Sequence, residues 1–235
     1  METATSQDQV LTRAAQVIQS ASALLIGASN GLSIAEGYNI FADNALFQEQ
    51  FGEFRTQYGF RSVLQGCFFE YPDPQERRRF FEHLVQLWIT DYTPGPVMQA
   101  LRSLVGSREH FIVTSNADRH LQKAGFAEEN VFEIEGNFET MMNHTSAENR
   151  TMELARFINR HSDSNLVFLE LGVGSGNPFI KEPFMNLCAT LPNSFYLSFN
   201  LPQEIFLPRS IADRSLAVTG DLAQTLRALN ALCPV

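Results

Sequence analysis

The sequence predicts an α/β fold built on one parallel sheet. Short apolar runs alternate along the chain with segments whose apolar residues recur at helical spacing, which is the pattern of strands joined by helices. Several apolar runs also end in loops rich in glycine and small polar residues, as strands do where a sheet binds a ligand at its carboxyl edge. These features are typical of a doubly wound, Rossmann-like sheet, and 235 residues with 44% hydrophobic content suffice for one domain over 1–235.

The predicted elements can be justified in chain order. A helix over 7–20 places Val10, Leu11, Ala14, Val17 and Ile18 on one face, and a buried strand over 23–26 follows it. Residues 34–93 are rich in aromatic side chains and contain no clear strand, which predicts a helical insertion. The remaining elements are helix 94–105, strand 110–114, helix 119–124, strand 131–134, helix 147–161, strands 166–171, 194–199 and 216–218, and helix 221–232.

The aromatic residues of the insertion allow two interpretations. They could line a groove for an acyl group or a protein substrate, or they could form the core of a small helical lobe. Their helical spacing favours a lobe core. The segment therefore predicts a helical insertion lobe on the first strand-to-helix connection.

Composition limits the class of protein. The chain has 26 acidic and 17 basic residues and a net charge of -9, so we expect no nucleic-acid partner. Its three cysteines, Cys67, Cys188 and Cys233, form no CxxC pair, which suits a reducing compartment and disfavours a four-cysteine zinc site. No apolar run approaches the roughly 18 residues of a membrane span, and the first ten residues lack a signal-peptide core. We therefore expect a cytoplasmic protein with no membrane partner.

The first strand runs into a glycine-containing loop, LLIGASNGLS, over 24–33. Gly27 and Gly31 allow a tight turn and close approach of the main chain to a diphosphate, and amides near a helix start favour anions. The run has neither the GxGxxG spacing of a dehydrogenase nor the GK[ST] ending of a P-loop. By itself it is equally consistent with a strand-to-helix turn that binds nothing.

Three further strand ends carry polar or glycine-rich loops. They are TSNAD over 114–118, EGN over 135–137 and GVGSGN over 172–177. Asn116 and Asp118 could bind ribose hydroxyls or a carboxamide, and the alternative for each is an ordinary helix N-cap. Two glycine-rich loops at one sheet edge can flank an extended dinucleotide, which favours a binding site.

In this order the motifs resemble those of the sirtuins. GASNGLS resembles their GAGxS loop, TSNAD followed by HLQKAG resembles the TQNxD block, and EGNF stands where sirtuins carry His-Gly. LGVGS, FNL and TGDLAQTL resemble the later glycine-threonine-serine, asparagine and GDxxxxL blocks. The resemblance extends from about residue 23 to residue 229. The insertion and YGFRSVLQG are most similar to the divergent bacterial branch that includes the macrodomain-linked sirtuins.

The resemblance implies NAD as the cofactor and cleavage of its nicotinamide–ribose bond. Asn116, Asp118 and Glu135 match catalytic positions, with the nicotinamide end near them and Ser115. The diphosphate is expected against Gly27, Ala28 and Ser29, next to Gly31. The adenine side is expected to use Gly172, Val173, Gly174, Ser175, Asn200, Leu201, Asp221 and Leu222.

Two departures from the sirtuin pattern bear on the reaction. Glu135 replaces the histidine that acts as base in deacylases, and an unperturbed glutamate, with a pKa of ~4.3, is a weaker base near neutral pH. The reduced small-lobe segment, about 138–165, contains no cysteine, so the zinc lobe is expected to be reduced or absent and no zinc is expected. His144 and His161 in this segment are expected to be solvated rather than metal ligands.

The replacement by Glu135 favours transfer of ADP-ribose to a protein or to water over deacylation, and the resemblance to the macrodomain-linked branch implies transfer to a protein acceptor. The resemblance implies a lipoylated carrier protein as a candidate acceptor and a macrodomain hydrolase as a further candidate partner. NAD glycohydrolysis, protein deacylation and a non-catalytic sensor of NAD or ADP-ribose remain the alternatives. The sensor would not need Asn116 or Asp118, whose presence counts against it.

Overall fold

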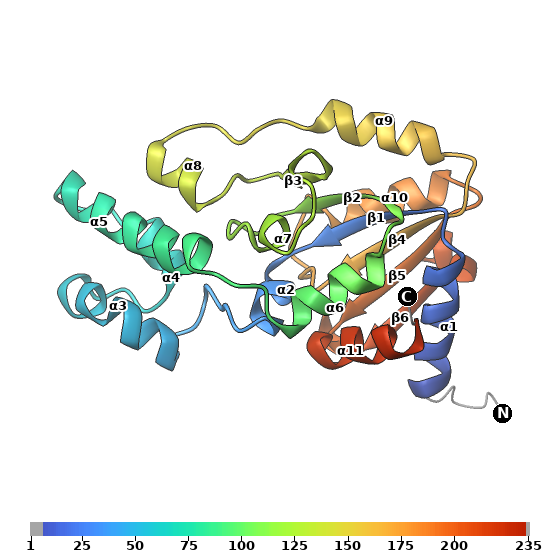
Figure 1. Cartoon of the computed structure of the whole chain (residues 1–235), viewed down its shortest axis with the longest axis horizontal. Coiled ribbons are helices and arrows are strands. Elements are labelled where there is room, and N and C mark those ends of the chain that lie inside the picture. Colours follow the sequence, from blue (N-terminus) through green and yellow to red (C-terminus); the bar gives the residue numbers. More distant parts are fainter. Residues whose placement is uncertain (1–6, 234–235) are drawn as a thin grey trace.

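The computed structural model describes residues 7–233, and its centre is a sheet of six parallel strands. The strand order is β3-β2-β1-β4-β5-β6 (Figure 1). The strands are β1 Ala23–Ala28, β2 Glu109–Thr114, β3 Val131–Glu133, β4 Leu166–Leu171, β5 Phe195–Asn200 and β6 Ser215–Thr219. The chain builds the sheet outward from β1 in both directions, so the predicted doubly wound, Rossmann-like sheet is confirmed.

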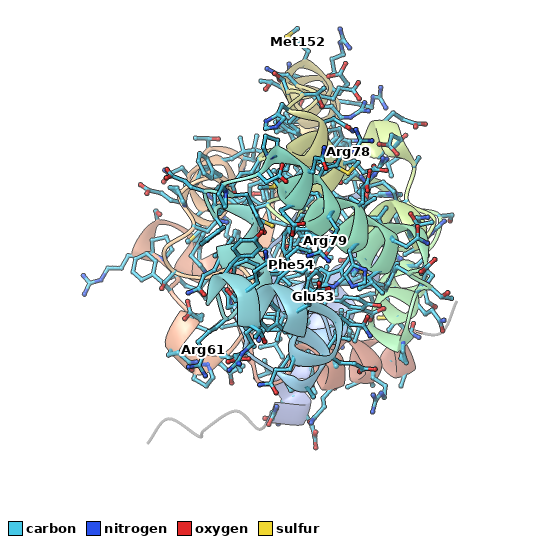
Figure 2. The ribbon with its side chains drawn as sticks, turned by 90° about the vertical axis from the view of Figure 1, so that its left-hand side faces the viewer. Glu53, Phe54, Arg61, Arg78, Arg79 and Met152 are labelled. Carbon is cyan, nitrogen blue, oxygen red and sulfur yellow. The ribbon has the colours of Figure 1, made fainter. Side chains whose placement is uncertain are left out.

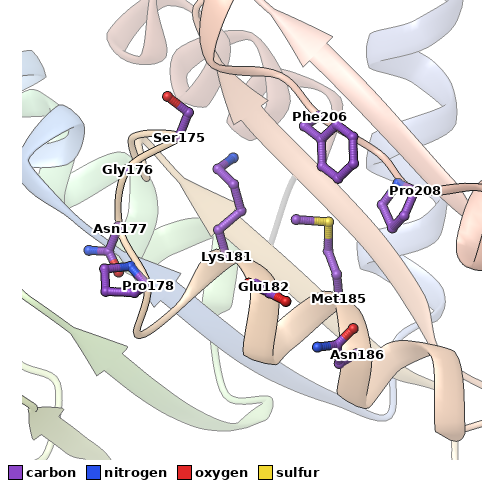
Figure 3. Close-up of a pocket in the computed structure, with 10 residues that line it drawn as sticks. All are labelled: Ser175, Gly176, Asn177, Pro178, Lys181, Glu182, Met185, Asn186, Phe206 and Pro208. Carbon is purple, nitrogen blue, oxygen red and sulfur yellow. The ribbon is translucent and has the colours of Figure 1, made fainter.

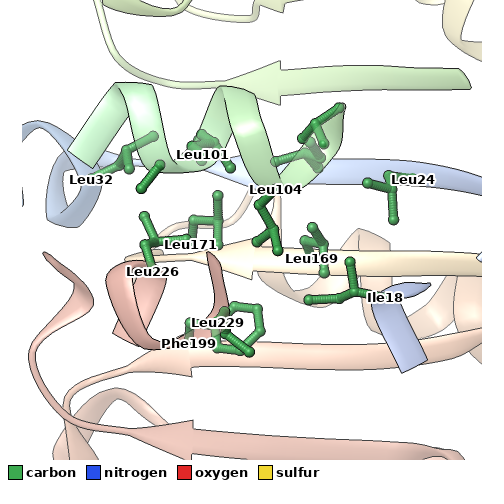
Figure 4. Packing of buried hydrophobic residues seen from close by; sticks show 14 of the residues in the cluster. Ile18, Leu24, Leu32, Leu101, Leu104, Leu169, Leu171, Phe199, Leu226 and Leu229 are labelled. Carbon is green, nitrogen blue, oxygen red and sulfur yellow. The ribbon is translucent and has the colours of Figure 1, made fainter. Parts of the chain in front are cut away.

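Helices cover both faces of the sheet (Figure 1). One face packs against α1 Gln7–Ser20, α6 Pro96–Val105 and α11 Leu222–Leu232, and the other against α9 Thr151–His161 and α10 Lys181–Thr190. Figure 4 shows the first layer, in which leucines of α6 and α11 meet those of β1 and β4. Alternate side chains of β1 enter the two cores, which explains why this strand is apolar throughout.

Helix α10 is an element that the sequence analysis did not predict. Phe184, Met185 and Cys188 on it are buried against the sheet. Pro183 lies in its first turn, where a missing amide is tolerated. Pro178 and Pro183 are turn signals in sequence, and they mask a helix whose stability comes from tertiary packing.

The insertion is helical, as predicted. It follows α2 Asn30–Ala35 and contains α3 Ala45–Tyr58, α4 Val63–Cys67, α5 Pro74–Val85 and the π-helical turn η1 Gln86–Thr90. Most of its aromatic side chains form one buried cluster, which includes Phe47, Phe51, Phe54, Phe60, Phe80, Phe81 and Trp88. The preference for a lobe core is therefore confirmed for these residues.

Helices α3 and α5 are also joined by Arg79 (Figure 2). Its guanidinium lies 2.9 Å from the Glu53 carboxylate and 2.8 Å from that of Glu76, and it stacks 4.5 Å from the Phe54 ring centroid. The cation–π contact and the apolar cluster beneath it hold the two helices together.

The segment after β3 contains α8 Phe138–Asn143, which begins at a capping box formed by Asn137 and Thr140. Phe138 packs into the aromatic cluster of the lobe. The helix predicted from residue 147 begins only at Thr151, whose amide donates to the Asn149 side chain at 2.9 Å. That local bond offers the backbone an alternative to the helix. The remaining short elements are α7 His120–Lys123, η2 Glu128–Asn130, η3 Pro202–Glu204 and η4 Arg209–Arg214.

Candidate functional site

The candidate site lies at the carboxyl edge of the sheet, where the loops after β1, β2 and β4 meet. Strand β1 lies between β2 and β4, so the chain leaves the middle of the sheet in opposite directions on its two sides. Such a switch point leaves a crevice beyond the strand ends, which is where open α/β sheets bind ligands. The fold therefore brings the predicted loops 27–31, 114–118 and 172–177 together.

The two glycine-rich loops touch through their backbones. The Gly31 amide donates to the Gly172 carbonyl at 3.0 Å, and a Cβ on Gly31 would lie 2.6 Å from the Gly172 Cα. Gly172 itself has φ +59°, a conformation that favours glycine. The Ser29 amide donates to the Leu171 carbonyl at 3.3 Å. Both amides are thus already paired, and both glycines are required by loop contact.

The absence of a side chain at Gly27 is also explained by packing within the protein, without a ligand. A Cβ at this position would lie 2.4 Å from Ile180 and 3.0 Å from Phe184 at the start of α10. Gly27 and Ala28 both belong to β1, which pairs with β2 and β4 on its two sides. The diphosphate contact of residues 27–29 therefore stays a prediction.

Side chains from three loops form a polar chain across the crevice. The hydroxyl oxygens of Ser29 and Ser115 lie 2.9 Å apart, and the Asn177 amide donates to Ser115 at 3.1 Å. The side-chain oxygen of Asn177 accepts hydrogen bonds from the backbone amides of Phe179 and Ile180, at 3.0 and 3.1 Å. The sequence analysis did not assign Asn177 to the site, although it ends the fourth polar loop.

Asn116 is buried, with 4% exposure, and it is fixed from two sides. Its side-chain amide donates to the Ser29 carbonyl at 3.2 Å, and its backbone amide donates to the Thr114 hydroxyl at 3.0 Å. Its side-chain oxygen is buried without a hydrogen-bond partner. A buried acceptor of this kind needs a donor, and a carboxamide or ribose hydroxyl can supply one.

Asp118 is equally buried, with 5% exposure, and accepts two hydrogen bonds. The Ser33 hydroxyl on α2 donates to one carboxylate oxygen, and the His120 amide donates to the other at 3.0 Å. The N-cap residue of α7 is Arg119, so Asp118 is not the helix N-cap that the sequence left open, although its carboxylate accepts the first helical amide. Asp118 therefore stabilises the beginning of α7 and also contributes a carboxylate to the site.

A cavity of about 190 Å³ joins the sheet edge to the helical lobe. Asn30, Ser115, Asp118 and Glu135 form its polar side. Glu135 is exposed, whereas Asp118 is buried, so the two carboxylates lie at different depths. The apolar side consists of Ile40, Phe41, Val63, Leu64, Cys67, Phe68, Ala117, Phe138 and Met141.

The residues predicted for the adenine side already have partners within the protein. The Ser175 amide donates to the Glu204 carboxylate at 2.6 Å, and this bond lowers the Glu204 pKa. The side-chain amide of Asn200 donates to the Val173 backbone carbonyl at 2.7 Å, and its side-chain oxygen accepts the Leu201 backbone amide at 3.0 Å.

The same holds at the start of α11, where Asp221 caps the helix by accepting the Gln224 amide at 2.8 Å. The Val173 and Leu222 side chains are buried in the core, so only their backbones could face a ligand. A Cβ on Gly174 would meet only Glu204, at 3.8 Å. Adenine binding by these residues stays a prediction.

A buried ion pair supports the loop after β4. The Lys181 ammonium lies 2.5 Å from the Glu170 carboxylate and 3.1 Å from the Glu204 carbonyl. Glu170 also accepts from the Tyr196 and Ser198 hydroxyls, and burial together with Glu170 raises the Tyr196 pKa. The only sequence signal for this network is one carboxylate in an otherwise apolar strand.

A larger cavity, of about 630 Å³, lies between that loop and α10 (Figure 3). It is lined by Ser175, Gly176, Asn177, Pro178, Lys181, Glu182, Met185, Asn186, Phe206 and Pro208. None of the predicted catalytic residues lines it, whereas Asp118 and Glu135 line the smaller cavity and Asn116 lines neither. The smaller cavity is therefore the better candidate for the reaction.

Within residues 7–233, no group of three His, Cys, Asp or Glu side chains is placed to hold a metal ion.

His161 is buried and lies 2.7 Å from the Glu109 carboxylate, so the expectation that it is solvated is wrong. Glu109 is on β2, and nothing in sequence marks it as the partner. Among the residues that the structure describes, no helix is long and apolar enough to cross a membrane.

Comparisons with known proteins bear on the fold and the overall sequence, and no family model matches the chain. The chain is 25% identical to a "Protein ADP-ribosyltransferase" of Staphylococcus aureus (strain Mu50), over 95% of this chain and 87% of that protein. It also matches a solved structure described as "Structural Basis for the Mechanism and Regulation of Sir2 Enzymes". That match has a TM-score of 0.56 and 10% identity, and it covers 96% of this chain and 98% of the other. The chain therefore has the fold of this Sir2 structure, and its sequence is similar to that of a protein named as an ADP-ribosyltransferase.

Proposed function

We propose that the protein cleaves the nicotinamide–ribose bond of NAD and transfers ADP-ribose to a protein acceptor. The observation that carries this proposal is the buried side-chain oxygen of Asn116, which has no hydrogen-bond partner, two residues before the buried carboxylate of Asp118. The Asn116 oxygen can accept a hydrogen bond from a ligand, and the Asp118 carboxylate places a negative charge at the wall of the 190 Å³ cavity. The name of the Staphylococcus aureus relative supports the same activity.

The chain's own residues suit the charges of this reaction. When the glycosidic bond breaks, its electron pair leaves with neutral nicotinamide and the ribose gains oxocarbenium character. A fixed carboxylate near that ribose lowers the barrier electrostatically, most effectively where water is excluded. Asp118 meets both conditions, because it is buried and its two donors hold it in place.

Glu135 is suited to a different task. It lines the same cavity but is exposed, so an acceptor arriving from outside can reach its carboxylate. There it can take the proton of an acceptor nucleophile as the new bond to the ribose forms. Water could also reach this carboxylate, so the support for transfer to a protein over attack by water is the name of the Staphylococcus aureus relative. A lipoylated carrier protein is the candidate acceptor, a macrodomain hydrolase is a candidate partner, and the cytoplasm is the proposed compartment.

The test is product analysis after incubation with NAD, with and without a lipoylated carrier protein. Nicotinamide together with an acceptor heavier by one ADP-ribose supports transfer. Free ADP-ribose alone would instead make the protein a glycohydrolase, and O-acyl-ADP-ribose from an acylated peptide would make it a deacylase. Bound but intact NAD with every acceptor would identify a sensor.

The matched variants are Asn116→Ala and Asn193→Ala. Asn193 is an exposed asparagine whose side chain contacts only the Asp163 carbonyl among the described residues. Asn116→Ala is expected to lose about a hundredfold or more in nicotinamide release while still binding NAD. Asn193→Ala is expected to behave as the wild type. Unchanged turnover in Asn116→Ala would remove its proposed role.

A further inference from the structure

His120 links the helical lobe to Asp118. It begins α7, and its side chain is fully buried. One ring nitrogen, Nε2, lies 2.8 Å from the Trp88 carbonyl in the lobe. The other, Nδ1, lies 3.5 Å from the Asp118 carboxylate and has no hydrogen-bond partner. The imidazole therefore spans the distance between the lobe and the candidate site.

The contact with Trp88 fixes the tautomer of the neutral ring. A carbonyl oxygen can only accept a hydrogen bond, so Nε2 must carry the hydrogen. Nδ1 then presents a lone pair toward the Asp118 carboxylate, and no hydrogen bond forms between them. A second proton could only go onto Nδ1, where it would point at Asp118.

The backbone between the two residues is built to bring them together. Arg119 has φ +59°, an uncommon conformation for a residue with a side chain. Its guanidinium is held by Glu128 and Glu139, at 2.5 and 2.8 Å. This turn lets Asp118 accept the His120 amide while the two side chains face each other.

Aromatic rings enclose the imidazole on the remaining sides. Tyr92 stacks on it with ring centroids 3.6 Å apart, and Tyr38 meets it edge-on at 4.5 Å. The Tyr92 hydroxyl donates to Glu36 at 2.7 Å. The titratable groups facing His120 are thus Asp118, Glu36, Tyr38 and Tyr92. Burial lowers the His120 pKa, and the charge of Asp118, the Trp88 carbonyl and Glu36 oppose that shift.

We propose that His120 is a positioning residue for Asp118, and that its protonation switches the site off in acid. While His120 is neutral, the Asp118 carboxylate faces no positive charge from the imidazole and keeps its bonds from Ser33 and the His120 amide. A proton on Nδ1 would form a charge-assisted hydrogen bond to Asp118. The resulting positive charge on the imidazole would offset the carboxylate charge that stabilises the oxocarbenium-like ribose. This proposal rests on the function proposed above.

The first test is the pH dependence of nicotinamide release from NAD. The wild type is expected to lose kcat by about tenfold per pH unit below the His120 pKa, which burial places under 6.5. His120→Gln can still donate to the Trp88 carbonyl. It should show a lower kcat at pH 7, an unchanged KM for NAD and no fall in kcat at low pH. The same fall in kcat at low pH in His120→Gln would overturn the proposal.

His110→Gln is the matched control. His110 is a half-buried histidine on β2 whose ring also contacts a backbone carbonyl, that of Arg108, at 2.8 Å. It lies near the amino end of its strand, away from the candidate site. This variant should show the same fall in kcat at low pH as the wild type. If His110→Gln abolished that fall, the fall would reflect the stability of the protein rather than protonation of His120, and the proposal would be overturned.

The second test needs no activity and is carried out on the whole protein. NMR of protein labelled with ¹⁵N-histidine should show His120 as the Nε2–H tautomer at pH 7. Asp118→Asn should lower the His120 pKa by about one unit or more, because an opposite charge within a few ångströms is lost. An unchanged pKa would overturn the proposed coupling. Absence of nicotinamide release from a wild type with normal coupling would instead overturn the proposed function.

Discussion

The contact between the two glycine-rich loops can be tested with Gly31→Ala. The new Cβ would lie 2.6 Å from both the Cα and the carbonyl oxygen of Gly172, and ordinary contacts begin near 3.4 Å. The loops would have to separate by about 0.8 Å, and the neighbouring atoms are backbone, which cannot rotate away. Overpacking of this kind costs about 1–3 kcal/mol, and loss of the Gly31–Gly172 hydrogen bond adds about 1 kcal/mol.

The assay is thermal unfolding together with calorimetric titration of NAD. For a chain of this size, each kcal/mol lowers Tm by roughly 2–4 °C, so Gly31→Ala should lose about 4 °C or more. NAD affinity should fall about tenfold, since the displaced loops border the proposed binding crevice. Gly176→Ala is the control, because a Cβ there meets nothing within 4 Å. If Gly31→Ala matched this control in Tm and affinity, the account of the loop contact would be wrong.

Three further predictions concern single side chains. Glu135→Gln should bind NAD normally but modify the protein acceptor more slowly, as mass spectrometry of the acceptor would show; equal modification would contradict its role as a base. Burial raises the Cys67 pKa to about 12, so maleimide at pH 8 should label Cys67 only after unfolding. Burial also raises the Glu133 pKa above 4.5, so ionised Glu133 destabilises the fold. Urea unfolding of Glu133→Gln should show a stability advantage over the wild type that grows as pH rises above 4.5, and a constant difference would refute this.

The sequence predicted the sheet well because local patterns encode it. The apolar runs at β1, β4 and β5 correspond to strands buried on both faces, so nearly every position must be apolar. The polar loops were also predicted to meet, since the carboxyl ends of parallel strands share one edge. Helix α10 was missed because its stability depends on contacts with β1 and β4 rather than on its own composition.

The finer details of the site depend on tertiary contacts that no local pattern contains. The diphosphate contact of Gly27 stays a prediction, and the structure adds a packing reason for this glycine, because a Cβ there would meet Ile180 and Phe184. His120, Asn177 and Ser33 acquire their roles only because distant segments bring Trp88, Ser115 and Asp118 to them. Similarly, Glu170 is a single unexpected residue in sequence, and its partner Lys181 lies on the helix that was not predicted.

The most direct test of the central claim is a crystal structure with a non-hydrolysable NAD analogue. The account predicts the dinucleotide at the carboxyl edge of β1 and β4, with its nicotinamide end in the 190 Å³ cavity and a donor within hydrogen-bond distance of the Asn116 oxygen. An analogue bound instead in the 630 Å³ cavity beside α10, with the Asn116 oxygen still unpartnered, would contradict it.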